Sequence, residues 1–274
     1  MAAVRPADSR RLPIALRLVK SALRRRRLDR VLDRLRFRLD TFPRSGPLRR
    51  LTHASYQPLP WLGLEGGSRA AGTWSRWHAI ERRLDELDGG LRTGLDVGAN
   101  YGFFTISLAR RGITTVAVDD SANAGRTIVH VIRRLRLEPV ASLLTLRVSP
   151  SSVELLPYAD VVLFLAVWHH LTRAYGLEPA TAILRAVWAR TRRVLFFETG
   201  EREMPPDFRL PAMEPDAQTW LTAFLAEVCE GGEVRHLGRH PAFDAAGNPV
   251  ERNLFAVERG GTHGSPTSPL LHPS

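Results

Sequence analysis

Hydrophobic and polar positions along residues 91–258 follow two patterns in turn. Short, almost continuous apolar runs indicate strands that are buried on both faces, and several segments between them repeat their apolar residues at helical spacing. The predicted strands cover residues 91–97, 114–118, 143–148, 161–166, 194–197, 233–237 and 253–257. The predicted helices cover residues 103–111, 122–135, 179–190 and 219–228. This alternation predicts an α/β domain in which helices cover both faces of a mostly parallel sheet.

The flanks of this domain are predicted from shorter patterns. The last two strands are joined by GRHPAFDAAGNPVER, which is too short for a helix and predicts a hairpin with an antiparallel final strand. Residues 56–90 are predicted to be a linker and a lead-in helix, TWSRWHAIERRLDEL, with Thr73 or Ser75 as its N-cap. Residues 259–274 have no packing pattern and are predicted to be a disordered tail.

Positive charge is concentrated near the N-terminus. Residues 1–50 hold fifteen arginines and Lys20 against four aspartates, a net charge of +12, whereas the whole chain carries +11. Leucines recur there at helical spacing, which predicts a basic amphipathic helical extension over residues 1–55. Its leucine face can pack on the protein's own domain, or residues 10–50 can bind an anionic membrane surface. Nucleic acid is the less favoured partner, because the rest of the chain is nearly neutral.

The remaining composition narrows the cellular setting. With 274 residues the chain can form one large domain with an extension. Cys229 is the only cysteine, which excludes an intrachain disulfide and favours a reducing compartment. No apolar run reaches the ~18 residues of a membrane-spanning helix, and the arginine-rich start lacks the pattern of a secretory signal. We therefore expect a cytoplasmic protein, with a peripheral position at the inner membrane surface if the basic extension binds lipid.

The segment GLDVGANYGFFTISLARRGITTVAVDD carries the main candidate binding site. Its first strand leads into a turn where Gly98 and Gly102 allow a ligand close to the backbone, and where Asn100 tolerates unusual dihedral angles. Asp96 can hold this turn or accept a hydrogen bond from a ligand ammonium group. About 20 residues later Asp119 ends the second strand, where a carboxylate can accept both hydroxyls of a ribose. The spacing favours a nucleoside-containing cofactor.

The same residues argue against two common nucleotide sites. Gly98, Asn100 and Gly102 depart from the G-x-G-x-x-G pattern of dinucleotide sites, and no G-x-x-x-x-G-K-[ST] phosphate loop occurs. Instead, LDVGANYGFFTISLA resembles motif I of the class I S-adenosylmethionine-dependent methyltransferases, and VAVDDS resembles their acidic second-strand motif. The D-x-G-A-N-x-G form is similar to FkbM-type O-methyltransferases. The resemblance covers about residues 91–258.

This resemblance implies a doubly wound, seven-stranded, mostly parallel sheet with an antiparallel last strand, and S-adenosyl-L-methionine as the cofactor. It implies that Asp96, Gly98, Asn100 and Gly102 contact the methionine part of the cofactor and that Asp119 binds its ribose. The third strand is followed by VSPSSVELLP, without the acidic residue that often meets the adenine. We therefore expect adenine recognition through backbone and apolar contacts.

The acceptor side is predicted from the fourth and fifth strands. ADVVLFLAVWHHLTRAYG differs from the V-E-G ending expected late in the sheet of FkbM-type enzymes, and it resembles general methyltransferase domains in which an apolar strand runs into paired His. His169 and His170 would lie beside the transferred methyl group, where a neutral imidazole can accept a hydroxyl proton. Glu198 ends the fifth strand and would orient a histidine or a substrate hydroxyl. A purely structural role for each histidine is the alternative.

A metal site is not expected, and three functions are compared. Glu198, Glu201 and Glu203 could join the histidines as ligands, but no tight spacing such as H-x-x-x-H supports this. The favoured function is O-methylation of a hydroxyl on a small molecule such as a secondary metabolite, on a glycan or on a glycolipid. One alternative is an RNA methyltransferase, against which the near-neutral domain argues. The other is a catalytically degenerate protein that binds a membrane surface. The sequence predicts no oligomeric state.

Overall fold

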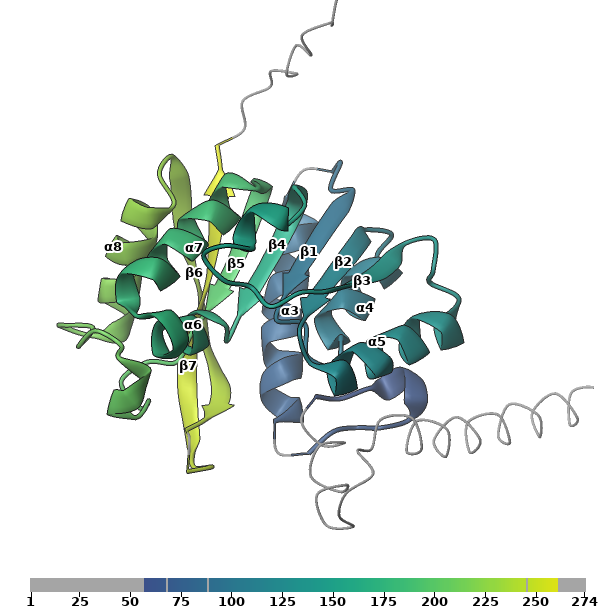
Figure 1. Cartoon of the computed structure of the whole chain (residues 1–274), viewed down its shortest axis with the longest axis horizontal. Helices are drawn as coiled ribbons and strands as arrows, with labels where there is room; N and C mark the ends of the chain where they lie inside the picture. Colours follow the sequence, from purple (N-terminus) through teal and green to yellow (C-terminus); the bar gives the residue numbers. More distant parts are fainter. Residues whose placement is uncertain (1–56, 68, 88, 245, 261–274) are drawn as a thin grey trace, which may run out of the picture.

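The computed structural model describes residues 57–67, 69–87, 89–244 and 246–260, which form one seven-stranded sheet with helices around it (Figure 1). The strands are β1 (Thr93–Val97), β2 (Thr114–Asp119), β3 (Ala141–Thr145), β4 (Ala159–Leu165), β5 (Thr191–Glu198), β6 (Gly232–Phe243) and β7 (Pro249–Arg259). Their order across the sheet is β3-β2-β1-β4-β5-β7-β6. Only β7 runs antiparallel to its neighbours. The predicted fold class and its antiparallel last strand are confirmed.

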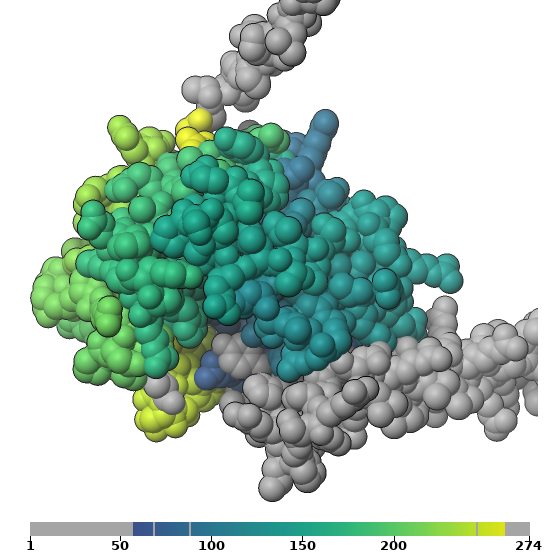
Figure 2. Space-filling view, in the orientation of Figure 1, coloured from purple at the N-terminus to yellow at the C-terminus, as the bar shows by residue number. Residues whose placement is uncertain are grey.

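Helices cover both faces of the sheet, as the doubly wound pattern predicts. One face carries α3 (Ala70–Glu86), α4 (Phe103–Arg110) and α5 (Ala122–Leu135), and the other carries α6 (Trp168–Tyr175), α7 (Leu177–Ala189) and α8 (Ala217–Val228). In the space-filling view the teal α5 side and the green α7 side meet in one continuous surface (Figure 2). The two faces therefore bury two layers of apolar side chains.

The central strand β4 shows why its sequence is apolar at every position. Val161 and Leu163 pack in the layer beneath α3 and α4, whereas Val162 and Phe164 pack in the layer beneath α7 and α8. All four side chains are fully buried. Successive residues of a strand point to opposite faces, so a strand that is covered on both sides needs a continuous apolar run.

Two segments after the third and fourth strands differ from the prediction. Residues 168–175 form α6, a helix too short to show a helical period, which buries Trp168 and Leu171. The predicted third strand, 143–148, lies two or three residues too far along, because β3 ends at Thr145. The following apolar residues, Leu146 and Val148, leave the sheet and line a cavity instead.

The final hairpin is longer than predicted. The sequence suggested a strand over 233–237, but β6 continues to Phe243 and includes Pro241. β6 is the edge strand of the sheet and is paired only with β7, so a proline that lacks an N–H is tolerated there. Most of its residues are exposed or half-buried, which hides the strand from a search for apolar runs. The extra length carries residues 241–243 to the cavity.

The lead-in helix begins earlier than predicted and packs on the sheet. Neither Thr73 nor Ser75 is its N-cap, since the helix starts at Ala70 and the Thr73 hydroxyl donates to the carbonyl of Arg69 within the helix. A Cβ atom on Gly72 would lie 1.9 Å from the carbonyl oxygen of Pro241, so α3 and β6 are in direct contact. The predicted basic extension, 1–55, and residues 261–274 of the predicted tail lie outside the described residues. Within the described part of the chain, no helix is both long and apolar enough to cross a membrane.

Candidate functional site

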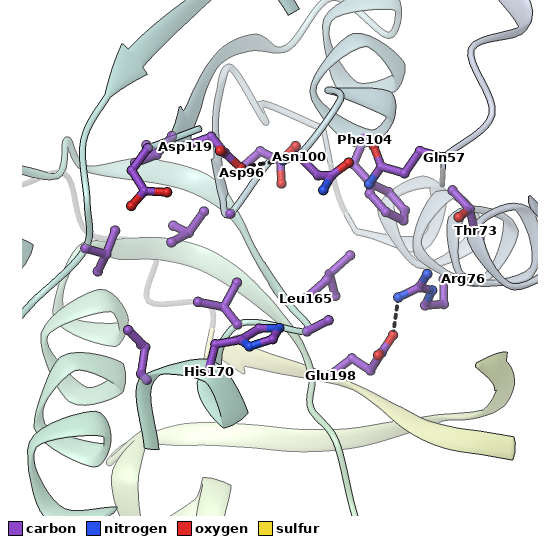
Figure 3. Close-up of a pocket in the computed structure, with 18 of the residues that line it drawn as sticks. Gln57, Thr73, Arg76, Asp96, Asn100, Phe104, Asp119, Leu165, His170 and Glu198 are labelled. Carbon is purple, nitrogen blue, oxygen red and sulfur yellow. Dashed lines mark hydrogen bonds and ion pairs between the residues drawn. The ribbon is translucent and has the colours of Figure 1, made fainter. Parts of the chain in front are cut away.

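A cavity of about 500 Å³ opens at the carboxyl ends of β1, β2, β4 and β5 (Figure 3). Open α/β sheets bind ligands at this edge, where the chain order changes direction, here between β1 and β4. The walls come from the turn after β1, the ends of β2 and β4, helices α3 and α6, and the β6–β7 hairpin. Segments far apart in the sequence therefore meet at one site.

The turn between β1 and α4 presents its backbone to the cavity. Gly98 and Asn100 have φ angles of 72° and 52°, in the left-handed region that Gly and Asn adopt most easily. A Cβ atom on Gly98 would lie 2.6 Å from the Cγ2 of Val167, so a side chain there would push into the cavity wall. Gly102 begins α4, and a Cβ atom there would meet Ile128 at 2.9 Å. Gly102 thus permits close packing of α4 against α5 and does not line the cavity.

Asp119 ends β2 and is held by two backbone amides. Its Oδ2 accepts a hydrogen bond from the N–H of Asn100 at 2.8 Å, and its Oδ1 accepts one from the N–H of Ser121 at 2.8 Å. Each carboxylate oxygen can accept a second hydrogen bond, which leaves capacity for a ligand diol. Partial burial raises the pKa of Asp119, and the two backbone hydrogen bonds oppose this rise. The adjacent Asp120 is exposed and pairs with Arg147 at 2.6 Å.

Asp96 lies in β1, beneath the turn, and is 3 % exposed. Its Oδ2 accepts a hydrogen bond from the Thr105 hydroxyl at 2.6 Å. Burial raises the pKa of Asp96 to about 6, against the opposing effect of the Thr105 hydrogen bonds, and the negative charge of Asp119 adds to the rise. A buried carboxyl that lines a cavity and loses its proton reluctantly is suited to a cationic ligand, whose charge would favour the ionised form.

The two predicted histidines have different surroundings. His169 is buried and lies outside the cavity lining, and its Nδ1 accepts a hydrogen bond from the N–H of Gly200 at 2.8 Å. Thr199 Oγ1 lies 3.3 Å from the same nitrogen. Burial, followed by the charges of His170 and Arg252, lowers the pKa of His169 well below its usual value. The neutral ring of His169 holds the loop that follows β5.

His170, by contrast, faces the cavity from α6 and is exposed (Figure 3). Its ring packs 5.7 Å from the ring of Phe208, and no residue in the described part of the chain hydrogen-bonds its nitrogens. Partial loss of hydration at the cavity wall, followed by the positive charges of Arg173 and Arg252, lowers the pKa of His170. A neutral imidazole with unbonded nitrogens can accept a proton from a ligand.

Glu198 lines the cavity from the end of β5 although it is only 1 % exposed. Its Oε2 accepts a hydrogen bond from Nη1 of Arg76, drawn as a dashed line in Figure 3. Its Oε1 is buried, has no hydrogen-bond donor within the described residues, and lies 3.7 Å from Nη1 of Arg252. A buried carboxylate oxygen without a donor is unfavourable by itself. This oxygen is therefore available to a donor group on a ligand.

Several cavity residues come from the lead-in helix, which the sequence did not connect with the site. Arg69 and Thr73 line the cavity together with Arg76, at spacings of four and three residues that place them on one face of α3. Further along the same face, Ile80 and Leu84 are buried in the apolar core. The change from polar to apolar on one helix face marks the point where the cavity ends and the core begins. That change was visible in the sequence, but the position of the helix was not.

The carboxylates that could have joined a metal site serve the hairpin instead. Glu201 accepts hydrogen bonds from the backbone and side-chain amides of Asn253 at 2.6 and 2.9 Å. Glu203 pairs with Arg252 at 2.8 Å, and Arg252 is buried and lines the cavity, where the sequence suggested only a rim position. Over the described ranges, no group of three or more His, Cys, Asp or Glu is placed to hold a metal ion.

Solved methyltransferase structures have the same fold. The bifunctional kinase-methyltransferase WbdD superposes with a TM-score of 0.59 at 20% identity, over 74% of this chain and 44% of that chain. Magnesium protoporphyrin IX methyltransferase (ChlM) from Synechocystis PCC 6803 with bound SAM superposes with a TM-score of 0.51 at 14% identity, over 80% of this chain and 100% of that chain. The chain thus matches less than half of the length of WbdD.

These similarities define the fold of the chain, which is that of the class I methyltransferases. No protein-family model matches the chain, and no curated protein matches it. The FkbM-like subtype therefore stays a prediction from the motif around Asp96. The assignment of individual site residues rests on the geometry of the cavity.

Proposed function

We propose that this protein is an S-adenosylmethionine-dependent methyltransferase that methylates a hydroxyl oxygen on a small molecule or glycan. The observation that carries the proposal is the joining of two chemistries in one cavity. The carboxylates of Asp96 and Asp119 lie at one end, and His170 and the donor-less oxygen of Glu198 lie at the other. The ChlM structures with bound SAM and SAH support the choice of cofactor for this fold.

The acidic end of the cavity fits this cofactor. Asp119 would accept hydrogen bonds from the ribose hydroxyls, and Asp96 would face the positive charges of the methionine part. The missing side chain of Gly98 leaves room for close backbone contact. Leu146 and Val148 offer apolar surface to the adenine, in keeping with the expectation of apolar contacts there. When bound, S-adenosylmethionine supplies a methyl group on a positively charged sulfur, which a nucleophilic oxygen can displace.

The other end of the cavity would prepare the acceptor. An aliphatic hydroxyl is a weak nucleophile until it gives up its proton, and His170 is the group placed to take that proton. General bases of this kind contribute about 10²–10⁴-fold to a rate. His169 is not placed for this role, because its Nδ1 already accepts the Gly200 amide and its ring is buried. We therefore assign the base to His170.

Glu198 would orient the acceptor and not act as the base. Its ion pair with Arg76 fixes one oxygen, and the other oxygen is free to accept a hydrogen bond from a hydroxyl of the acceptor. A carboxylate held by an arginine in this way defines a direction for the donor. Hydroxyl orientation by Glu198 and proton removal by His170 together favour an alcohol as the acceptor.

Two measurements test the proposal. Calorimetry on the full-length protein should show micromolar binding of S-adenosylhomocysteine, and absence of binding would sink the cofactor assignment. Methyl transfer from labelled S-adenosylmethionine to a panel of alcohols and glycans, followed by alkaline treatment of the product, identifies the bond formed. Methyl ethers survive alkali, whereas methyl esters are hydrolysed, so an alkali-labile product would contradict methylation of a hydroxyl.

A further inference from the structure

We propose that the acceptor carries an anionic group, a carboxylate or a phosphate, and that Arg69, Arg76 and Arg252 bind it. These three residues are called the arginine wall below. The inference rests on the proposed function, since it concerns the acceptor end of the same cavity. It adds the charge of the substrate, which neither the fold nor the cofactor motifs specify.

The cavity has two ends of opposite charge. Asp96, Asp119 and Asp120 line the end beside β1 and β2, where Arg147 pairs with Asp120. The arginine wall lines the other end, where Glu198 is the one carboxylate among the described lining residues. Charges in a cavity with low-dielectric walls act more strongly than charges on an open surface. The acceptor end therefore attracts anions, while the cofactor end attracts cations.

The arginine wall is held in position by neighbouring groups that leave hydrogen-bond donors unused. Arg252 donates from Nε to Glu203 at 2.8 Å and from Nη2 to the carbonyl of Phe243 at 3.1 Å, but its Nη1 lies 3.7 Å from Glu198, too far for a hydrogen bond. Arg76 donates from Nε to the carbonyl of Gly72 at 3.1 Å and from Nη1 to Glu198. A guanidinium has five N–H donors, so both arginines keep capacity for a ligand.

The aromatic contacts of the wall add to this fixed arrangement. The guanidinium of Arg69 lies 5.8 Å from the ring centre of Phe243, and that of Arg76 lies 5.7 Å from the ring centre of Phe104. Stacking on aromatic rings restrains the planar head groups while leaving their edges available. Planar, restrained guanidinium groups are the usual means by which proteins bind carboxylates and phosphates.

Glu198 separates the roles of the acceptor's groups. An anion placed directly against Glu198 would be repelled, whereas a hydroxyl can donate to its free Oε1. An acceptor with both groups satisfies the site: the hydroxyl lies between Glu198 and His170, and the anionic group meets Arg69 and Arg252. Hydroxy acids and phosphorylated sugars have this combination.

The test uses phenyl phosphate as the anionic probe and phenol as its uncharged counterpart. The full-length protein, free and saturated with S-adenosylhomocysteine, is titrated with each probe by calorimetry at constant ionic strength. We expect phenyl phosphate to bind both forms, with affinity for S-adenosylhomocysteine unchanged, and phenol to bind at least about tenfold more weakly. Arg69→Gln should weaken phenyl phosphate binding about tenfold or more, and Arg69→Glu should abolish it, because a charged hydrogen bond is lost and then reversed in sign.

A matched control separates the wall from general charge. Arg173 lies on α6, close enough to affect His170, but it does not line the cavity. Arg173→Gln removes the same charge and should leave phenyl phosphate binding unchanged.

Three outcomes would overturn the inference. Equal binding of phenol and phenyl phosphate would show that the wall does not select anions, and equal weakening by Arg69→Gln and Arg173→Gln would show a general charge effect. Competition between phenyl phosphate and S-adenosylhomocysteine would show that the wall holds the cofactor's own carboxylate. Failure of S-adenosylhomocysteine to bind is a different result, which overturns the proposed function, and titration of the free protein then still decides whether the arginine wall binds anions.

Discussion

The carboxylate of Asp119 accepts a hydrogen bond from the backbone N–H of Asn100 at 2.8 Å, and this contact joins the ends of two neighbouring strands. Asn100 has a φ angle of 52°, so the hydrogen bond helps to hold the turn after β1 in a left-handed conformation. The same carboxylate faces the cavity. Its side chain therefore shapes the turn and is available to a ligand at the same time.

Substitutions at this contact should weaken cofactor binding. Asp119→Ala removes a charged hydrogen-bond acceptor, and we expect S-adenosylhomocysteine to bind about 10- to 150-fold more weakly. Gly98→Val places a branched side chain against Val167 at a positive φ angle and should reduce binding at least as much. Calorimetry measures both. Asp120→Ala is the control, and because exposed pairs contribute under about 1 kcal/mol it should change affinity less than about fivefold.

The two histidines should respond differently to substitution. His170→Ala should lower turnover about 10²-fold or more and leave S-adenosylhomocysteine affinity unchanged, because His170 is placed at the acceptor end. His169→Ala leaves the buried N–H of Gly200 without its acceptor, so it should lower the melting temperature. Turnover assays and thermal melts of both variants check this. Full turnover in His170→Ala would show that the exposed histidine is not the base.

The pH dependence of turnover provides a separate check on His170. The base must be neutral, so turnover should rise with pH through the pKa of His170 and then reach a plateau. Loss of hydration and the charges of Arg173 and Arg252 lower that pKa, which places the midpoint below 6.5. The rise should vanish in His170→Ala. A midpoint above 6.5 that survives in this variant would point to another group.

The cofactor end of the site could be predicted because its pattern is local. β1, its turn and β2 follow one another in the chain, and their apolar runs and glycines are recognisable without knowledge of the fold. Burial of β4 on both faces likewise gave a continuous apolar run. The sheet and the position of Asp96 and Asp119 at its edge follow from these short segments.

The acceptor end could not be predicted, because it depends on contacts between distant segments. Arg76 and Glu198 are 122 residues apart, and no local pattern shows that they meet. The choice between His169 and His170 depends on the rotation of α6, since consecutive helical residues point about 100° apart. With a helix of only eight residues, the sequence showed no period from which to derive that rotation.

Removal of residues 1–50 tests the role of the basic extension. The described cavity lining begins at Gln57, so the shortened protein should still fold and bind S-adenosylhomocysteine. If the extension binds anionic lipid, vesicle sedimentation should capture the full-length protein, less strongly as salt rises, and should not capture the shortened one. If its leucines pack on the domain, neither protein should sediment, and the shortened one should melt at a lower temperature or aggregate.

Asp96→Asn should stabilise the protein without ligand while weakening cofactor binding. The pKa of Asp96 is raised from 3.8 to about 6, so between these values the folded state holds a proton that the unfolded state has lost. Stability of the natural protein therefore falls as pH rises through this range, and the loss is complete above pH 6. Asparagine avoids the loss and can still accept the hydrogen bond from Thr105.

The expected gain is about 3 kcal/mol at pH 7.5, and it should disappear below about pH 4. For a domain of this size that gain corresponds to a rise of roughly 6–12 °C in melting temperature. Cofactor affinity should change in the opposite direction, because a neutral amide lacks the charge that attracts the sulfonium and ammonium groups. In the natural protein affinity should fall as pH drops below 6, whereas in Asp96→Asn it should not. Melting curves at pH 4 and 7.5, with calorimetry at pH 5 and 7.5, measure both effects, and a less stable Asp96→Asn at pH 7.5 would contradict a destabilising buried charge.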